Sequence, residues 1–177
     1  MWRYTYDPKG RRTAKLRMAA DGTTVAERTT FTWDDTTLCE QTEHSADLLH
    51  PVTLTWDHRG LRPIAQTERI TAAEAPQEEI DSRFFAIVTD LVGTPRELVD
   101  EHGDIAWRAR SILWGTTAWI TGATTYTPLR FPGQLRLALP SLAGHSRQRW
   151  RRCTRSASRS TLGDTLASTR AAIAFKA

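Results

Sequence analysis

Through most of the first 115 residues, apolar or β-branched side chains alternate with polar ones in short runs. A period of two is typical of β-strands that bury one face. We expect strands at residues 3–6, 11–16, 25–33, 51–56, 61–64, 96–99, 105–109 and 112–115. Residues 83–88 are almost entirely apolar, which predicts a strand covered on both faces. Residues 36–50 leave open a short helical turn or a polar crossing at 45–49, and 66–82 is expected to be mostly a charged loop.

Reversals between these runs are marked by an aspartate followed three positions later by a glycine. This spacing predicts a type I turn, in which the Asp side chain caps amides of the turn and Gly takes the fourth position. The predicted turn residues are Asp7, Gly10, Asp57, Gly60, Asp90, Gly93, Asp100 and Gly103. The turns recur at unequal spacings, so the pattern favours an all-β antiparallel ribbon of hairpins over a solenoid with identical rungs.

Aromatic residues fall at alternating positions of the predicted strands. We expect Trp56, Trp107 and Trp114 to pack across neighbouring strands. The alternative is a surface adhesion module whose exposed rings bind carbohydrate. That alternative predicts saturable glycan binding that one or two Trp→Ala changes abolish without unfolding the protein.

Charge divides the chain near residue 134. Residues 1–134 carry 15 Lys and Arg against 19 Asp and Glu, whereas residues 135–177 carry nine against one. The net charge of +4 therefore describes neither part. The boundary predicts a folded segment at 1–134 followed by a basic, largely disordered or irregular tail at 135–177.

The cysteines, the apolar runs and the first residues of the chain show which kinds of protein the sequence does not resemble. Cys39 and Cys153 lack metal-type or disulfide-framework spacing, so two unpaired thiols are expected. No apolar run approaches the ~18 residues of a membrane span. The first residues lack a signal-peptide core and enter a strand at once, so we expect a piece of a longer protein.

Several segments resemble the Rhs, or YD-repeat, family. Residues 4–12, Tyr-Thr-Tyr-Asp-Pro-Lys-Gly-Arg-Arg, resemble its tyrosine–aspartate repeat. Residues 89–109, continued by Leu-Trp-Gly at 113–115, resemble the more specific segment near the end of the Rhs core. Residues 129–134, Leu-Arg-Phe-Pro-Gly-Gln, resemble the motif that follows it. The similarity covers about residues 1–134, and 89–115 is its most specific part.

The resemblance implies a β-sheet ribbon that winds into a hollow shell. In bacterial relatives such a shell encloses a variable C-terminal toxin used in contact-dependent competition. The partners implied are the remainder of the shell and its toxin cargo, and the location implied is secreted or at the cell surface. The segment itself is then structural and not an enzyme, and its exposed strand edges are expected to promote self-association. The function implied is a non-catalytic section of the shell wall; a non-functional remnant of a larger Rhs gene is the other alternative.

The chain departs from the family pattern after Gln134. The family usually ends in an Asp-Pro-x-Gly-Leu motif at which the core cuts itself, but here the one Asp-Pro is Asp7-Pro8. We therefore carry over no self-cleavage and no catalytic aspartates. The Arg-, Ser- and Ala-rich composition of 135–177 suggests an out-of-frame sequence. Translating the other two frames beyond codon 134 tests this hypothesis, because one should yield tyrosine-rich sequence.

The sequence gives little support for a catalytic or metal-binding site. Residues 43–50 hold Glu43, His44, Asp47 and His50, but no second ligand-rich segment completes a metal site. His58 and His102 lie in or beside predicted turns, and neither a nucleophile elbow nor a phosphate-binding loop is present. No cofactor is expected. Arginines at 147–159 form a basic run around Trp150 that predicts unspecific, salt-sensitive polyanion binding.

Overall fold

The computed structural model describes residues 1–46, 48, 50–72, 79–111, 117–119 and 122–131. These residues form one ten-stranded antiparallel sheet in which each strand pairs with its neighbours in sequence. No helix occurs among them. The strands are β1 (Trp2–Tyr6), β2 (Arg12–Met18), β3 (Val25–Asp34), β4 (Thr37–Ser45), β5 (Val52–Arg59), β6 (Arg62–Thr71), β7 (Glu79–Thr89), β8 (Pro95–Val99), β9 (Ile105–Ser111) and β10 (Thr117–Trp119).

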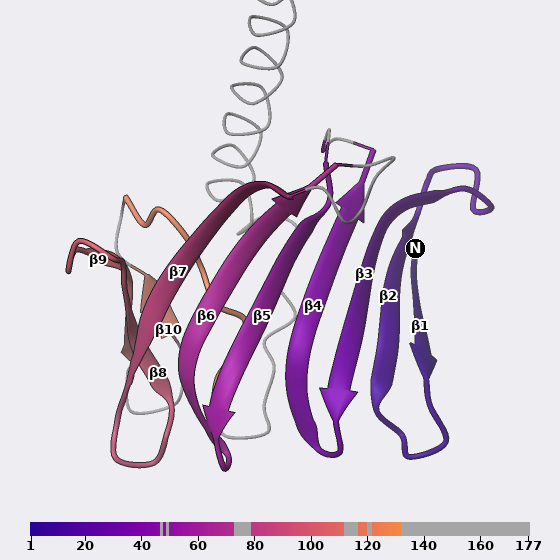
Figure 1. The fold of residues 1–177 in the computed structure, drawn as a ribbon. Helices are drawn as coiled ribbons and strands as arrows, with labels where there is room; N and C mark the ends of the chain where they lie inside the picture. Colours follow the sequence, from indigo (N-terminus) through magenta and orange to yellow (C-terminus); the bar gives the residue numbers. More distant parts are fainter. Residues whose placement is uncertain (47, 49, 73–78, 112–116, 120–121, 132–177) are drawn as a thin grey trace, which may run out of the picture.

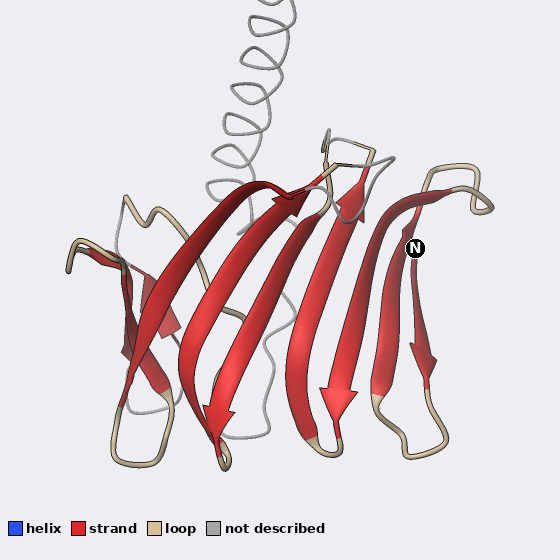
Figure 2. Cartoon of the chain, viewed as in Figure 1, coloured by secondary structure: helices blue, strands red, loops and turns tan. Residues whose placement is uncertain are grey.

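The sheet is open and curved. In Figure 1 the strands from β1 to β7 arch side by side, and β8 to β10 curl behind them. Figure 2 shows the same arrangement as strands joined by short loops. The all-β hairpin ribbon expected from the sequence is therefore confirmed.

Three Asp-x-x-Gly turns share one hydrogen-bond pattern. Gly10, Gly93 and Gly103 donate their amides to the carbonyls of Asp7, Asp90 and Asp100 at 2.9, 3.0 and 3.0 Å. In each turn the Asp Oδ1 also accepts the amides two and four residues later. All three glycines have positive φ. This left-handed conformation favours glycine because other L-residues are strained there.

The fourth such sequence differs from the expectation. Asp57 lies within β5 opposite Ala65, and Arg59 pairs with Arg62. The chain reverses at Gly60 and Leu61, a two-residue loop. Gly60 has φ +62° and Leu61 does not have positive φ, as a type II′ turn requires. The glycine thus opens a tight hairpin instead of ending a four-residue turn.

A β-bulge accompanies nearly every hairpin. In seven of the nine strand pairs the register shifts by one residue, always on the later strand and near its start. The skipped residues are Thr13, Ala26, Cys39, Ile64, Ile80, Arg96 and Ala106. A bulge bends its strand and increases the local twist. We attribute the curvature of the sheet to this row of bulges along both rims.

Two stretches that lacked a clear pattern are strands. Residues 37–45 form β4, so the alternatives of a helical turn or crossing at 45–49 apply at most to its end. Residues 62–71 form β6 and 79–89 form β7, so the expected charged loop at 66–82 is wrong for most of its length. The expectation failed because Gln66 and Glu68 occupy buried positions, which removes the alternation of apolar and polar residues.

Strand β7 is covered on one face, not two. Phe85 and Ile87 are buried, whereas Phe84 and Val88 are 43% and 45% exposed. The continuous apolar run suggested two covered faces because its exposed positions also carry apolar side chains. Residues 132–177, including the predicted boundary at 134 and the basic run at 147–159, lie outside the described residues.

Candidate functional site

Residues 122–131 form a covering segment that crosses one face of the sheet. We call this side the inner face. Figure 1 shows the segment behind the sheet, on the side toward which β8 to β10 curl. The amide of Thr124 donates to the carbonyl of Ala106 in β9 at 2.8 Å. The side chain of Gln41 in β4 donates to Tyr126 Oη at 3.3 Å. The segment therefore links strands far apart in the sheet.

Gln66 provides a central attachment point for this segment. Its Nε2 donates to the carbonyl of Tyr126 at 2.9 Å, and its Oε1 accepts Trp56 Nε1 at 2.8 Å. Gln66 is fully buried. Because an unmatched buried amide is costly, these two bonds fix both the Trp56 ring and the covering segment.

Glu68 provides a second attachment point, with an ion pair. Glu68 is 2% exposed; its Oε2 accepts Thr125 Oγ1 at 2.8 Å, and its Oε1 pairs with Arg83 Nη2. Arg83 also donates to the carbonyl of Thr124 at 3.4 Å. Register places Glu68 directly opposite Arg83 on β6 and β7. One carboxylate and one guanidinium thus hold the segment on the sheet.

Apolar side chains fill the space between the covering segment and the sheet. Leu129 belongs to the core cluster, and Ala123 and Tyr126 pack against it. The sheet contributes Phe31, Leu38, Leu54, Trp56, Phe85, Ile87, Leu98, Ala106, Trp107 and Ala109. A sheet with a hydrophobic face requires such a cover to exclude water from it.

The opposite, outer face carries polar interactions over β4, β5 and β6. Glu40, Thr55 and Arg69 interact across β4, β5 and β6, with Arg69 Nη2 at 3.1 Å from Glu40 Oε2. Thr42 and Thr53 share a hydrogen bond of 3.0 Å between hydroxyls. Threonine fits the pleated surface of a strand while remaining compatible with water.

The residues predicted from the sequence do not gather into a reactive cleft. Asp7, Asp90 and Asp100 lie in turns at the rims of the sheet, and Asp57 lies within β5. Trp56 and Trp107 are buried in the core. Trp114 lies outside the described residues. Burial of Trp56 and Trp107 removes both rings from the surface that the carbohydrate-binding alternative requires.

The four histidines that the structure describes, His44, His50, His58 and His102, lie on different strands, loops or turns. Burial and the nearby Arg28 lower the pKa of His44. Burial also lowers the pKa of His58, against the raising effects of a hydrogen bond to the Trp56 backbone and of Asp57. Among the residues described, no three His, Cys, Asp or Glu side chains are grouped as metal ligands. Cys39 is free, and Cys153 lies outside the described part of the chain.

In the described part of the molecule, no helix is both long and apolar enough for a membrane crossing.

The family assignment rests on the strands that carry the repeated turns. Residues 85–119, which include β8 and β9, match the family model described as RHS protein. This chain belongs to the RHS family. In this RHS chain the matched segment contains the two adjacent turns at Asp90 and Asp100 and the buried Trp107.

One curated relative is the double-stranded DNA deaminase toxin A of Burkholderia cenocepacia (strain H111). It is 33% identical over 144 residues, which cover 75% of this chain and 10% of the relative. The RHS chain therefore spans a tenth of the length of this relative.

Two solved structures share the fold. The crystal structure of TcdB2-TccC3 has 18% identity and a TM-score of 0.52 over 77% of this chain and 7% of that chain. TcdB2-TccC3 without its hypervariable C-terminal region has 16% identity and a TM-score of 0.55 over 77% and 6%. At these identities the likeness concerns the fold alone.

Sequence reasoning missed the attachment of the covering segment. Gln66 and Glu68 were assigned to a charged loop, and residues 122–131 carry no strong pattern. The available signal was the alternation of Gln66, Glu68 and Ile70 with the residues between them. All three are buried, but polar side chains at buried positions are a poor indicator of a strand.

Proposed function

We propose that this chain is a non-catalytic section of an RHS shell wall that encloses or presents a C-terminal toxin. The observation that carries the proposal is the curved hairpin sheet with its covered inner face, built from repeated turns and bulges. A wall of this kind can be extended by further hairpins because each strand needs only its sequence neighbours.

The comparisons support the proposal at a coarser level. The family match and the likeness to TcdB2-TccC3 support an RHS shell-type segment. The name of the curated relative describes a toxin that deaminates double-stranded DNA. We propose that any toxin activity of the natural protein resides outside residues 1–131. We further propose that the protein is secreted and acts in competition between bacteria.

The test is protection of the C-terminal region in the complete natural protein that contains this segment. We expect trypsin to spare that region while the wall is intact. A Gly93→Val, Gly103→Val double variant should expose it, because both turns need a positive φ. Thr55→Ala on the outer face is the control and should leave protection unchanged. If trypsin digests the C-terminal region as fast in the unaltered protein as in the double variant, the proposal is contradicted.

A further inference from the structure

Two turns at opposite rims of the sheet carry opposite charge. In an antiparallel sheet that follows the chain order, successive turns alternate between the two rims, so the β5–β6 and β8–β9 turns lie at opposite rims. Figure 1 shows the β5–β6 turn at the lower rim. We call residues 59–62 the basic tip and residues 101–105 the acidic tip.

The basic tip holds two cations that face each other. Arg59 pairs with Arg62 across the hairpin, and both are exposed. Like charges directly opposite one another destabilise a strand pair. Arg62 donates to the carbonyl of Leu91 at 3.2 Å, but neither arginine forms an ion pair in the described part of the chain. An anionic group from another molecule would relieve the repulsion.

The acidic tip presents two carboxylates to solvent. Glu101 and Asp104 are exposed, and neither forms an ion pair with a described residue. The carboxylate of Asp100 differs, because its Oδ1 accepts two amides of the turn. The tip therefore has two carboxylates that a cation can approach without breaking an existing pair.

Each tip also exposes an apolar side chain beside its charges. Leu61 lies between the two arginines of the basic tip and is 67% exposed. Ile105 follows Asp104 and is 45% exposed. Leu91, in the neighbouring turn to which Arg62 bonds, is 98% exposed and extends the apolar surface at the basic tip. Apolar groups bordered by polar and charged ones are typical of a protein–protein contact.

We infer that the basic tip of one copy of this chain docks on the acidic tip of a second copy. Arg59 and Arg62 would face the carboxylates of the acidic tip, while Leu61 would meet Ile105. A nucleic acid or an anionic membrane would match the basic tip alone, whereas a second copy supplies a match for both tips.

The contact runs head to tail, because each tip suits the other and repels its own kind. It leaves one tip of each copy unoccupied, so association is open-ended. A contact this small is weak, and salt screens it. The inference depends on the two turns only and goes beyond the proposed wall function, which the trypsin experiment tests separately.

The test is sedimentation velocity of the 177-residue chain over a range of protein concentrations. Self-association should weaken as sodium chloride rises from about 50 to 500 mM, because salt screens exposed charges. Two variants reverse one tip each: Arg59→Glu, Arg62→Glu and Glu101→Lys, Asp104→Lys. Each should weaken association about tenfold or more, because two attractions become two repulsions.

Combining all four substitutions should restore association. The tips then exchange their charges, while the formal net charge stays at +4. A mixture of the two double variants should also associate, since one retains the acidic tip and the other retains the basic tip. This mixture tests the contact even if the fourfold variant does not fold, which circular dichroism of each variant shows.

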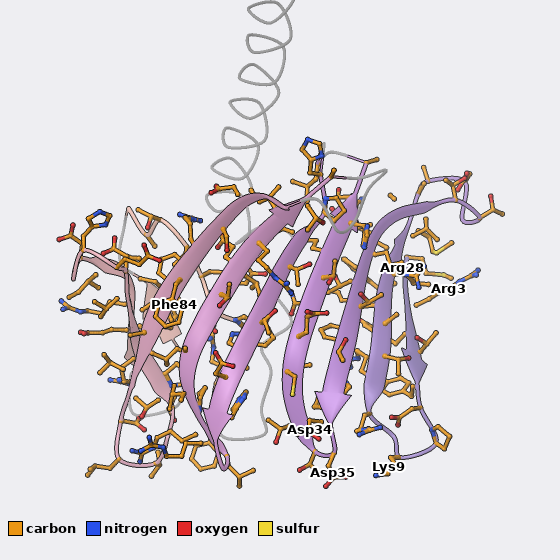
Figure 3. All side chains as sticks on the ribbon, in the orientation of Figure 1. Arg3, Lys9, Arg28, Asp34, Asp35 and Phe84 are labelled. Carbon is orange, nitrogen blue, oxygen red and sulfur yellow. The ribbon has the colours of Figure 1, made fainter. Side chains whose placement is uncertain are left out.

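The matched control is Arg3→Glu, Arg28→Glu. It makes the same change in net charge as reversal of the basic tip, but on the outer face, where Figure 3 shows both arginines. It should change association less than about twofold. Equal weakening by this control would mean that bulk charge governs association.

Other results would also overturn the inference. Absence of association, or association that salt does not weaken, would exclude a contact between charged tips. Weakening by one tip variant alone would mean that its tip has a different partner. If the mixture of double variants does not associate, the tips do not bind each other. If reversal of the basic tip abolishes binding to phosphatidylglycerol vesicles and leaves self-association unchanged, the basic tip is a lipid-binding surface instead.

Discussion

A single aspartate oxygen organises each repeated turn. In the turns at Asp7, Asp90 and Asp100, Oδ1 accepts the amides of the residues two and four positions later, at 2.9 to 3.1 Å. These amides are not used by the sheet ladder at the turn. The side chain therefore satisfies donors that would otherwise need water, and the glycine supplies the left-handed backbone that completes the reversal.

We expect Gly103→Ala to lower the free energy of unfolding by about 1–2 kcal/mol, the cost of a left-handed conformation for an L-residue. A Cβ at this position would meet nothing within 4 Å, so crowding does not contribute. Gly103→Asn should cost less, because asparagine tolerates this conformation. Urea denaturation of the three proteins gives the comparison. An Asn variant as unstable as the Ala variant would argue against backbone strain as the cause.

Asp21 offers a test at the β2–β3 turn. Its pKa is lowered from 3.8 to about 2, first by the hydroxyl of Thr24 and then by the amides of Thr24 and Thr23. Because the folded pKa is depressed, its stabilising effect is present above about pH 4 and is lost as the pH falls toward 2. Thr24→Val should raise the pKa of Asp21 in an NMR titration of carboxyl carbons. An unchanged pKa would assign the shift to the amides alone.

At this scale three of the four Asp-x-x-Gly sequences form a four-residue turn, and the sequence at Asp57 does not. The spacing of Asp and Gly does not say whether the glycine ends a four-residue turn or opens a two-residue one. At Gly93 and Gly103 it ends the turn, whereas at Gly60 it opens it, and Asp57 remains in the strand. The pairing of Arg59 with Arg62 leaves two residues for the loop and so selects the two-residue turn. That pairing depends on the register of the whole β5–β6 hairpin.

Among the elements, the covering segment differs from the strands because most of its described hydrogen bonds to the sheet involve side chains of the sheet. Gln66, Glu68 and Arg83 reach it from β6 and β7, across sequence separations of 41 to 60 residues. Contacts between side chains this far apart in the sequence are not predicted by any periodicity of apolar and polar residues. Strands β4 and β6 were unclear in the sequence for a related reason, since the buried polar side chains that hold this segment replace the apolar residues that would have marked a strand.

Glu68→Ala should lower the free energy of unfolding by about 3 kcal/mol, because it leaves the Arg83 charge without its partner in a mostly buried site. A Glu68→Leu, Arg83→Leu double variant should recover much of this loss, since no charge is then buried alone. Chemical denaturation of both variants measures the difference. A double variant less stable than Glu68→Ala would mean that the ion pair stabilises the segment beyond the cost of burying it.

At the scale of the whole sheet, β1 is the first of the ten described strands and is paired on one side only, with β2. Met1 accepts the amide of Met18, and Asp7 donates to Arg11, so alternate residues of β1 bond to β2. By that alternation the amides of Trp2, Tyr4 and Tyr6 point away from β2. An open edge of this kind can pair with another chain.

Tyr4→Pro should reduce concentration-dependent association, because proline removes an outward amide while leaving the bonds to β2 intact. Sedimentation velocity over a range of protein concentrations checks this. Thr5→Pro is the matched control and should instead lower the thermal midpoint, since its amide points toward β2. Tyr4→Ala separates the loss of the ring from the loss of the amide, and association that persists in Tyr4→Pro would place the contact elsewhere.

Because each of the ten described strands pairs with its neighbours in sequence, the sheet can grow in one direction as the chain is synthesised. Each hairpin that emerges from the ribosome pairs with strands that have already been synthesised. A sheet pulled from one end would unfold one hairpin at a time. The covering segment is the exception, since its partners lie far back in the chain. Once the covering segment binds the inner face, it links these distant strands, and the sheet can no longer unfold strand by strand without first releasing it.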